Sequence, residues 1–342
     1  MIDDQQMAVL PIKEIRRFLV NDKRIRAAIQ AGYDIELTDD PEVLSKRLVE
    51  ALDQIPHENP AQETVSNSEV LKAAVLAIAS SSANWATIQK KRAAIKSALC
   101  QYDPLAVTQA PEFEIRNELI RLLPGQNQTA NADAMIKWAV TLSENKDYYK
   151  EVICRTYLEI TEHPSWFAID SDKHFPMAVL SLAGIFANPV NRWRKLKPYK
   201  FHGMQVPIAC EFLRNLGWSG FKPDRHVIRA IALWEAALKE KHGDAVEKAF
   251  CHLVDIVDTT SKTILCPIKS AVYAVYATPA GMDYSEADNL LWAFISNVVN
   301  LRQKDIVNVW LKDQIDMTES SFDMYDRITK LDTWPNSLIC EE

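Results

Sequence analysis

Apolar residues recur along most of this chain at the three- and four-residue spacing that places them on one face of a helix. Near the N-terminus this spacing joins Ile12, Ile15 and Leu19. The run VLKAAVLAIAS, residues 70–80, is apolar on nearly every side and predicts a buried helix that starts near Glu69 with Ser68 as its cap. No apolar–polar alternation is long enough to predict a sheet. The pattern therefore predicts an all-α protein.

Short polar or Pro-Gly breaks separate the predicted helices. SSSANW ends the first buried helix, and a Pro-Gly turn divides the segment 115–144 into two helices. The other predicted helices cover 86–102, 148–169, 175–186, 189–197, 207–216, 224–242, 245–259, 269–276 and 285–301.

Composition suggests how the chain divides. The polar, proline-bearing stretch HENPAQETVSNS, residues 57–68, is typical of a linker or exposed loop. We predict an N-terminal helical extension (1–55), a linker (56–68), a helical core (69–245) and C-terminal helices packed on it (246–342). The extension is interpreted as a helical cap or as an accessory domain that binds a partner or DNA.

The charge of the chain is unevenly distributed. The net charge of the 342 residues is -7, yet nine cations lie between residues 192 and 229. A basic face on an acidic protein can bind DNA, while the acidic remainder weakens non-specific binding. These cations are Arg192, Arg194, Lys195, Lys197, Lys200, Arg214, Lys222, Arg225 and Arg229.

Other classes of protein lack support in the sequence. No two of the six cysteines have the C-x-x-C spacing, so we expect neither a metal nor another cofactor. Scattered cysteines favour the reducing cytoplasm. No apolar run reaches the roughly 20 residues of a membrane helix, so we expect no membrane partner. We expect a monomer.

One segment, residues 200–229, carries the candidate chemistry: KFHGMQVPIACEFLRNLGWSGFKPDRHVIR. It predicts a tight turn around Gly203, a helix that opens with Pro207, and a second helix that opens at Asp224. Proline suits the first turn of a helix, where its missing N–H would have no partner. An aspartate at a helix start lies close to backbone amide donors.

This segment resembles the helix-hairpin-helix DNA glycosylase superfamily. The resemblance rests on the turn His202-Gly203-Met204-Gln205 and on Pro223-Asp224-Arg225-His226-x-x-Arg229. It departs from the family at Gln205, where a second glycine is usual, and at Pro207, where strand-nicking members carry a lysine. It covers about half of the chain, residues 70–234, and implies two helical subdomains with a cleft between them.

The resemblance implies a site for double-stranded DNA that contains a modified base. Asp224 would be catalytic, and Glu211 and Trp85 would lie near the base. The residues implied to contact DNA are Lys200, His202, Gly203, Gln205, Lys222, Arg225 and the loop residues Ser81, Ser82 and Asn84. Plainer interpretations stay open: Asp224 as an ordinary helix cap, Trp85 as core, His226 as a structural hydrogen-bonder, and Glu211 at the surface or paired with Arg214.

The implied activity is hydrolysis of the N-glycosidic bond of a flipped-out base, without lyase chemistry because Pro207 offers no amine. The damaged bases of ordinary repair and a modified base in foreign DNA, as in antiviral defence, are two possible substrates. A non-catalytic helical module that binds DNA or protein, and a purely structural scaffold, are the alternatives.

Overall fold

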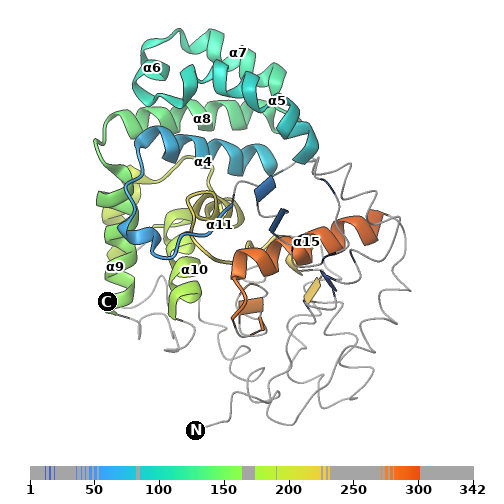
Figure 1. Ribbon diagram of the computed structural model, residues 1–342. Coiled ribbons are helices and arrows are strands. Elements are labelled where there is room, and N and C mark those ends of the chain that lie inside the picture. The colour runs from blue at the N-terminus through green and yellow to red at the C-terminus, as the bar shows by residue number, and fades with distance from the viewer. Residues whose placement is uncertain are drawn as a thin grey trace. The chain divides into compact units, whose positions relative to one another are not determined.

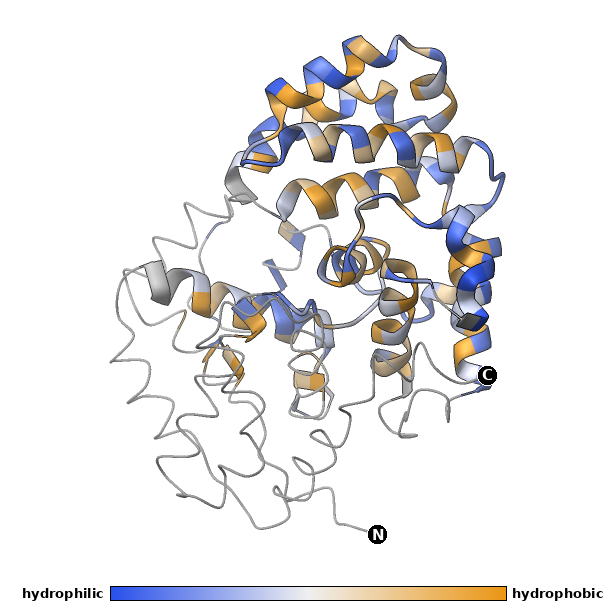
Figure 2. Cartoon of the chain, turned by 180° about the vertical axis from the view of Figure 1, so that it is seen from behind, coloured by the Kyte–Doolittle hydropathy of each residue, from blue (hydrophilic) through white to orange (hydrophobic). Residues whose placement is uncertain are grey.

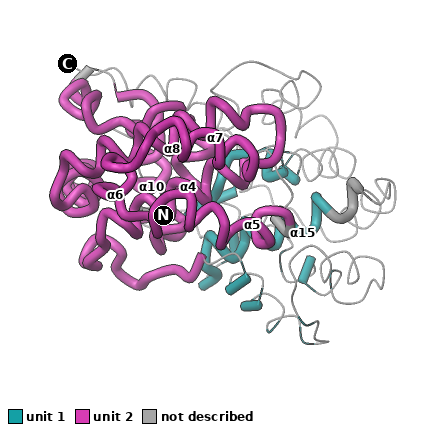
Figure 3. Tube along the Cα trace, turned by 90° about the horizontal axis from the view of Figure 1, so that it is seen from above, with its two compact units in different colours: residues 1–52, 220–335 teal, residues 53–219, 336–342 magenta. Residues whose placement is uncertain are grey.

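The computed structural model describes residues 54–81, 85–163, 174–189, 191–224 and 281–300, together with shorter stretches and single positions. Every regular element in this described part is a helix (Figure 1), which confirms the predicted helical class. The chain forms two compact units (Figure 3): unit 1 contains 1–52 and 220–335, and unit 2 contains 53–219 and 336–342. The division predicted from composition, at 55, 68 and 245, stays a prediction.

Unit 2 is a stack of helices. Helices α6 and α7 pack on α8, α8 on α4, α4 on α11, α11 on α10, and α10 on α9. Hydrophilic and hydrophobic residues both appear along these helices (Figure 2), as expected of helices with one face in a core. Their bounds are α4 Asn67–Ser80, α5 Trp85–Ala98, α6 Pro104–Gln109, α7 Glu112–Leu122, α8 Gln128–Ser143, α9 Arg155–Glu162, α10 His174–Ala187 and α11 Val206–Arg214.

Helix α4 begins two residues earlier than predicted, because Ser66 rather than Ser68 is its cap. The Ser66 hydroxyl accepts a hydrogen bond from the Glu69 amide at 3.3 Å, and the Glu69 carboxylate accepts one from the Ser66 amide at 2.8 Å. This reciprocal capping box satisfies two donors that a helix start leaves open. The hydrogen bonds from Ser66 also lower the pKa of Glu69.

Helix α5 ends at Ala98, although the pattern predicted a helix as far as 102. Cys100, Gln101 and Tyr102 have φ values of 49°, 63° and 65°, in the left-handed region, and form the short helical turn η3 (Cys100–Tyr102). Left-handed residues reverse the chain and stop a right-handed helix. Asp103 then caps α6, accepting from the amides of Leu105 and Ala106 at 3.0 and 3.3 Å.

Two further predicted helices have a different geometry. The segment predicted as a helix over 148–169 begins as a π-helix, η4 (Tyr149–Cys154), and continues as α9; its end, 164–169, lies outside the described residues. The segment predicted over 189–197 is a 3-10 helix, η7 (Asn191–Tyr199), with Pro198 inside it. Proline lacks the N–H that a continuing helix needs.

The polar stretch predicted as a linker belongs to unit 2 and is hydrogen-bonded to other parts of it. The Tyr149 hydroxyl donates to the carbonyl of Pro60, in the short 3-10 helix η2 (Pro60–Gln62), at 2.7 Å. The His57 amide donates to the carbonyl of Gly217 at 2.8 Å. Buried tyrosine hydroxyls need a partner, and here a backbone carbonyl of the polar stretch supplies it.

Unit 1 is described at fewer positions. Its clearest element is α15 (Tyr284–Asn300), which confirms the helix predicted over 285–301. Ile12, Ile15 and Leu19 are helical and buried, as their spacing predicts, and Arg16 between them forms an ion pair with Glu286 of α15. The helix predicted over 245–259 lies outside the described residues.

Phe201 is the centre of an aromatic cluster in unit 2. Its ring stacks on Trp138 of α8 at 5.4 Å and on Tyr148 at 5.0 Å, and it meets Phe212 of α11 at 5.6 Å. All four side chains are buried. Because aromatic side chains bury large areas and also gain from stacking, this cluster fixes the chain just before α11.

We expect Phe201→Ala to lower the free energy of unfolding by about 3–5 kcal/mol, because it leaves a cavity between three aromatic rings. Phe113 of α7 is the matched control, since 73% of it is exposed, and Phe113→Ala should change stability by no more than about 0.5 kcal/mol. Chemical denaturation of both variants measures the difference. Equal losses would contradict the role given to Phe201.

Candidate nucleic-acid interface

The turn predicted around Gly203 is present at the surface of unit 2. The Met204 amide donates to the Phe201 carbonyl at 3.2 Å, and Gly203 has a φ of +73°. Phe201 and Met204 point into the core, whereas His202, Gly203 and Gln205 are exposed. The turn therefore presents its outer residues to solvent from a fixed base.

Helix α8 packs against this turn. The indole N–H of Trp138 donates to the carbonyl of His202 at 2.8 Å. A Cβ added to Gly203 would meet the Cβ of Ala134, also on α8, at 3.9 Å, which is an ordinary contact. Glycine is therefore favoured here by its backbone conformation rather than by lack of space.

Helix α11 starts directly after the turn. Gln205 is its N-cap residue, but among the described residues no side chain accepts from the first amides of this helix, and Pro207 in the first turn has no N–H. Amide groups at a helix start carry partial positive charge and bind anions such as phosphate. Lys200, half-buried and at the beginning of the turn, adds a cation nearby.

Asp224 begins the next helical segment and belongs to unit 1. Its Oδ1 atom accepts hydrogen bonds from the amides of His226 and Val227 at 2.7 and 3.1 Å, so it caps this helix. Its Oδ2 atom lies 3.9 Å from the Lys222 ammonium and accepts no hydrogen bond from the described residues. Oδ1 thus holds the helix start, whereas Oδ2 has only the Lys222 ammonium near it among the described residues.

The turn and Asp224 lie in different compact units. The structure therefore establishes the local geometry of each, and their union in one site stays a prediction. His226 packs edge-on against Trp292 of α15 at 5.4 Å, and its interpretation as a structural hydrogen-bonder stays a prediction.

The predicted loop between α4 and α5 is described only at its edges. Ser81 is exposed and its hydroxyl donates to the carbonyl of Ile78 at 2.7 Å, closing the end of α4. Ser82 and Asn84 lie outside the described residues, as do Arg225 and the side chain of Trp85. Their predicted contacts with DNA or base stay predictions.

Glu211 is buried and forms the ion pair with Arg214 that the spacing allowed. Its Oε2 atom lies 3.1 Å from the Arg214 guanidinium, and its Oε1 atom accepts from the Gln54 side chain at 2.8 Å. Both oxygens thus already have partners inside unit 2. A role in contacting a base stays a prediction, and it would require these hydrogen bonds to change.

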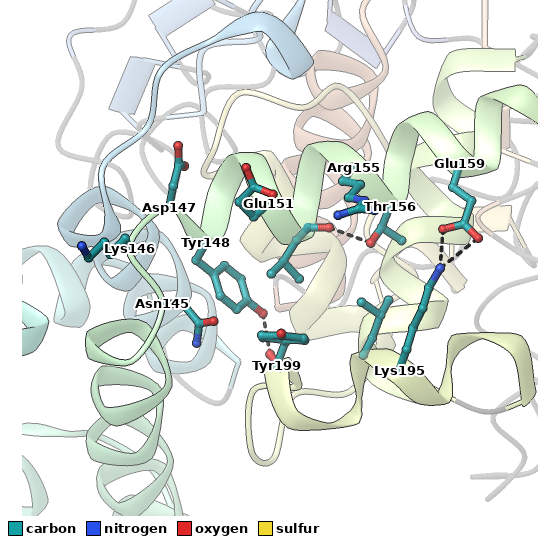
Figure 4. Close-up of a pocket in the computed structure, with 12 residues that line it drawn as sticks. Asn145, Lys146, Asp147, Tyr148, Glu151, Arg155, Thr156, Glu159, Lys195 and Tyr199 are labelled. Atoms are coloured by element: carbon teal, nitrogen blue, oxygen red, sulfur yellow. Dashed lines mark hydrogen bonds and ion pairs between the residues drawn. The ribbon is translucent and has the colours of Figure 1, made fainter.

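A pocket of about 560 Å³ lies elsewhere in unit 2, between η4, α9 and η7. Figure 4 shows Lys195 of η7 bonded to Glu159 of α9, at 2.8 Å, and the Tyr148 hydroxyl bonded to the Tyr199 carbonyl, at 2.5 Å. Burial raises the pKa of the Tyr148 phenol. Three acidic and three basic side chains line the pocket, so it carries no excess of positive charge for phosphate: Asp147, Glu151, Glu159, Lys146, Arg155 and Lys195.

None of the predicted site residues lines this pocket. The sequence does not predict this pocket, because it forms where two segments distant in sequence, 145–159 and 195–199, come together. The one signal within a single segment is the π-helical geometry of Tyr149–Cys154. Such geometry is common at functional sites, but apolar spacing does not distinguish it from an α-helix.

Comparison of the chain with known proteins assigns it to no family. No family model, no curated protein and no solved structure matches the chain. In the described part of the chain, no helix has the length and apolar character needed to cross a membrane. The same residues contain no group of three His, Cys, Asp or Glu side chains arranged to hold a metal ion.

We expect Gly203→Ala to destabilise unit 2 by about 1–2 kcal/mol, because an L-residue is strained at a φ of +73°. Gly203→Asn should cost less, since asparagine enters the left-handed region more readily. Chemical denaturation of both variants measures the difference. An alanine variant as stable as the natural protein would show that the turn relaxes to another conformation.

Proposed function

We propose that the protein is a monofunctional DNA glycosylase, which binds duplex DNA and hydrolyses the N-glycosidic bond of a flipped-out modified base. The observation that carries this proposal is the exposed glycine turn that leads straight into α11. Its outer residues are open to solvent, its backbone is fixed by Trp138 and Phe201, and the amides of the following helix start face no side-chain cap among the described residues. These properties suit the grip of a DNA phosphate.

The chemistry is assigned to Asp224. Breaking the bond between base and sugar develops positive charge on the sugar ring, and a nearby carboxylate stabilises that charge and orients the attacking water. The Oδ2 atom suits this role because Oδ1 alone makes the cap hydrogen bonds. Lys222, 3.9 Å from Oδ2, adds a cation beside the DNA backbone.

The reaction requires the nucleotide to leave the base stack, since the sugar carbon is inaccessible within a duplex. In the proposal, the turn and the cations around it hold the phosphates, while the loop after α4 fills the vacated space. The net charge of -7 limits non-specific binding to DNA, which favours a protein that acts on particular bases.

The substrate is a modified base, either a lesion or a base from foreign DNA. Incubation of the protein with duplexes of different modification, followed by identification of the freed base by mass, separates the two. A second candidate function is a non-catalytic module that binds DNA through the same turn, because the carboxylate of Asp224 already has a structural role as a cap. This module would bind DNA in a salt-sensitive way and free no base.

We expect Asp224→Asn to lower the rate of base release by about 10²–10⁴, the range by which a positioned acid or base accelerates reactions. Asparagine is also a good helix cap, so the free energy of unfolding and the affinity for DNA should stay near those of the natural protein. Single-turnover base release and DNA titration give the two readouts. Undiminished release would assign the chemistry to another residue.

We expect no covalent adduct when the protein is treated with borohydride in the presence of substrate DNA, because Pro207 has no amine to form a Schiff base. Gel electrophoresis under denaturing conditions detects such an adduct. A trapped adduct would show lyase chemistry from another amine and would overturn the monofunctional assignment.

A further inference from the structure

The chain passes between unit 1 and unit 2 near residues 52 and 53, near residues 219 and 220, and near residues 335 and 336. Within unit 2, the segments beside the first two passages lie against each other. Gln54 follows the first passage and contacts the end of α11, and Asn215 and Gly217 precede the second. The connections near residues 53 and 219 therefore leave unit 2 from one place.

Buried side chains join the two segments. The Gln54 amide nitrogen donates to Glu211 Oε1 at 2.8 Å and to Asn215 Oδ1 at 3.0 Å, while its oxygen accepts from Arg214 at 2.9 Å. Gln54, Glu211 and Arg214 are at most 7% exposed. Buried polar groups are costly when a partner is lost, so this network favours one arrangement strongly.

The backbone adds a second contact a few residues further on. The His57 amide donates to the Gly217 carbonyl at 2.8 Å, and the His57 ring covers the α-carbon of Gly217. A Cβ at position 217 would lie 1.8 Å from the ring carbon Cδ2, and Gly217 has a φ of +83°. Any other residue here would displace the His57 ring and would be strained at this φ.

We propose that Gln54, Glu211, Arg214 and the His57–Gly217 contact form a clamp that makes the connections near residues 53 and 219 behave as one. On this proposal Glu211 and Gln54 are positioning residues. The clamp fixes the C-terminal end of α11, whose N-terminal end carries the Gly203 turn, and it fixes the chain that leads to Asp224. This last consequence rests on the proposed function, whereas the clamp itself does not.

The direct test is native-state hydrogen exchange of segments 54–57 and 215–219. Gln54→Glu places two carboxylates beside one guanidinium, so exchange should rise at least about tenfold in both segments together. The double variant Gln54→Glu/Glu211→Gln restores one carboxylate and one amide around Arg214, and it should recover most of the protection. Loss confined to one segment, or a double variant no better than Gln54→Glu, would overturn the clamp.

Two further variants keep the test decisive. Gly217→Ala disturbs the His57–Gly217 contact without changing any charge, and it should raise hydrogen exchange in the same two segments. It replaces Gln54→Glu if that variant fails to fold. Glu159→Gln removes an ion pair on the same unit at a partly exposed site, and it should leave exchange in both segments unchanged. An effect of Glu159→Gln equal to that of Gln54→Glu would show general destabilisation instead of a clamp.

The rate of base release tests whether Gln54 and Glu211 act as positioning residues. With a duplex that the natural protein cleaves, Gln54→Glu should lower the rate of base release at least about tenfold and change DNA affinity less than about threefold, because the turn itself is intact. The double variant should recover the rate. Normal release from a loosened Gln54→Glu variant would overturn the positioning role. If the natural protein frees no base, the proposed function fails, and the exchange result still decides the clamp.

Discussion

The stacking of Phe201 between Trp138 and Tyr148 is the interaction on which the candidate interface depends. It buries one end of a short turn while the other end stays in solvent. The hydrogen bond from the Trp138 indole to the His202 carbonyl fixes the backbone at the same place. If the turn binds phosphate as proposed, its rigidity favours binding, because ordering a flexible loop on binding costs free energy. Helix α8 supplies this rigidity from outside the segment itself.

A second constraint acts at the other end of α11. There the helix is held by charged and amide side chains rather than by aromatic rings. Removing one partner from such a network leaves the others buried without compensation. Different interactions thus hold the two ends of the helix: packing of buried aromatic rings before it begins, and hydrogen bonds between buried polar side chains where it ends.

The carboxylates of Asp224 and Glu211 differ in how many of their oxygens are hydrogen-bonded. Asp224 uses one oxygen as a helix cap, and its other oxygen makes no hydrogen bond to the described residues. Glu211 uses both oxygens inside unit 2. A carboxylate that must meet a substrate needs an acceptor available for it, which favours Asp224 for chemistry and Glu211 for positioning.

Local features of the sequence determined the helical class, the breaks after α4 and between α7 and α8, the Gly203 turn and the cap at Asp224. Each follows from spacing, glycine or proline, or a capping side chain within a few residues, so the cause lies in the segment itself. Tertiary structure decided what these segments contact: the aromatic base under Phe201, the burial of Glu211 with Gln54, and the pocket between α9 and η7. Helix geometry also departs from what the spacing predicts, in the π-helix η4 and the left-handed turn η3. Such contacts join residues far apart in the chain, and no local pattern records them.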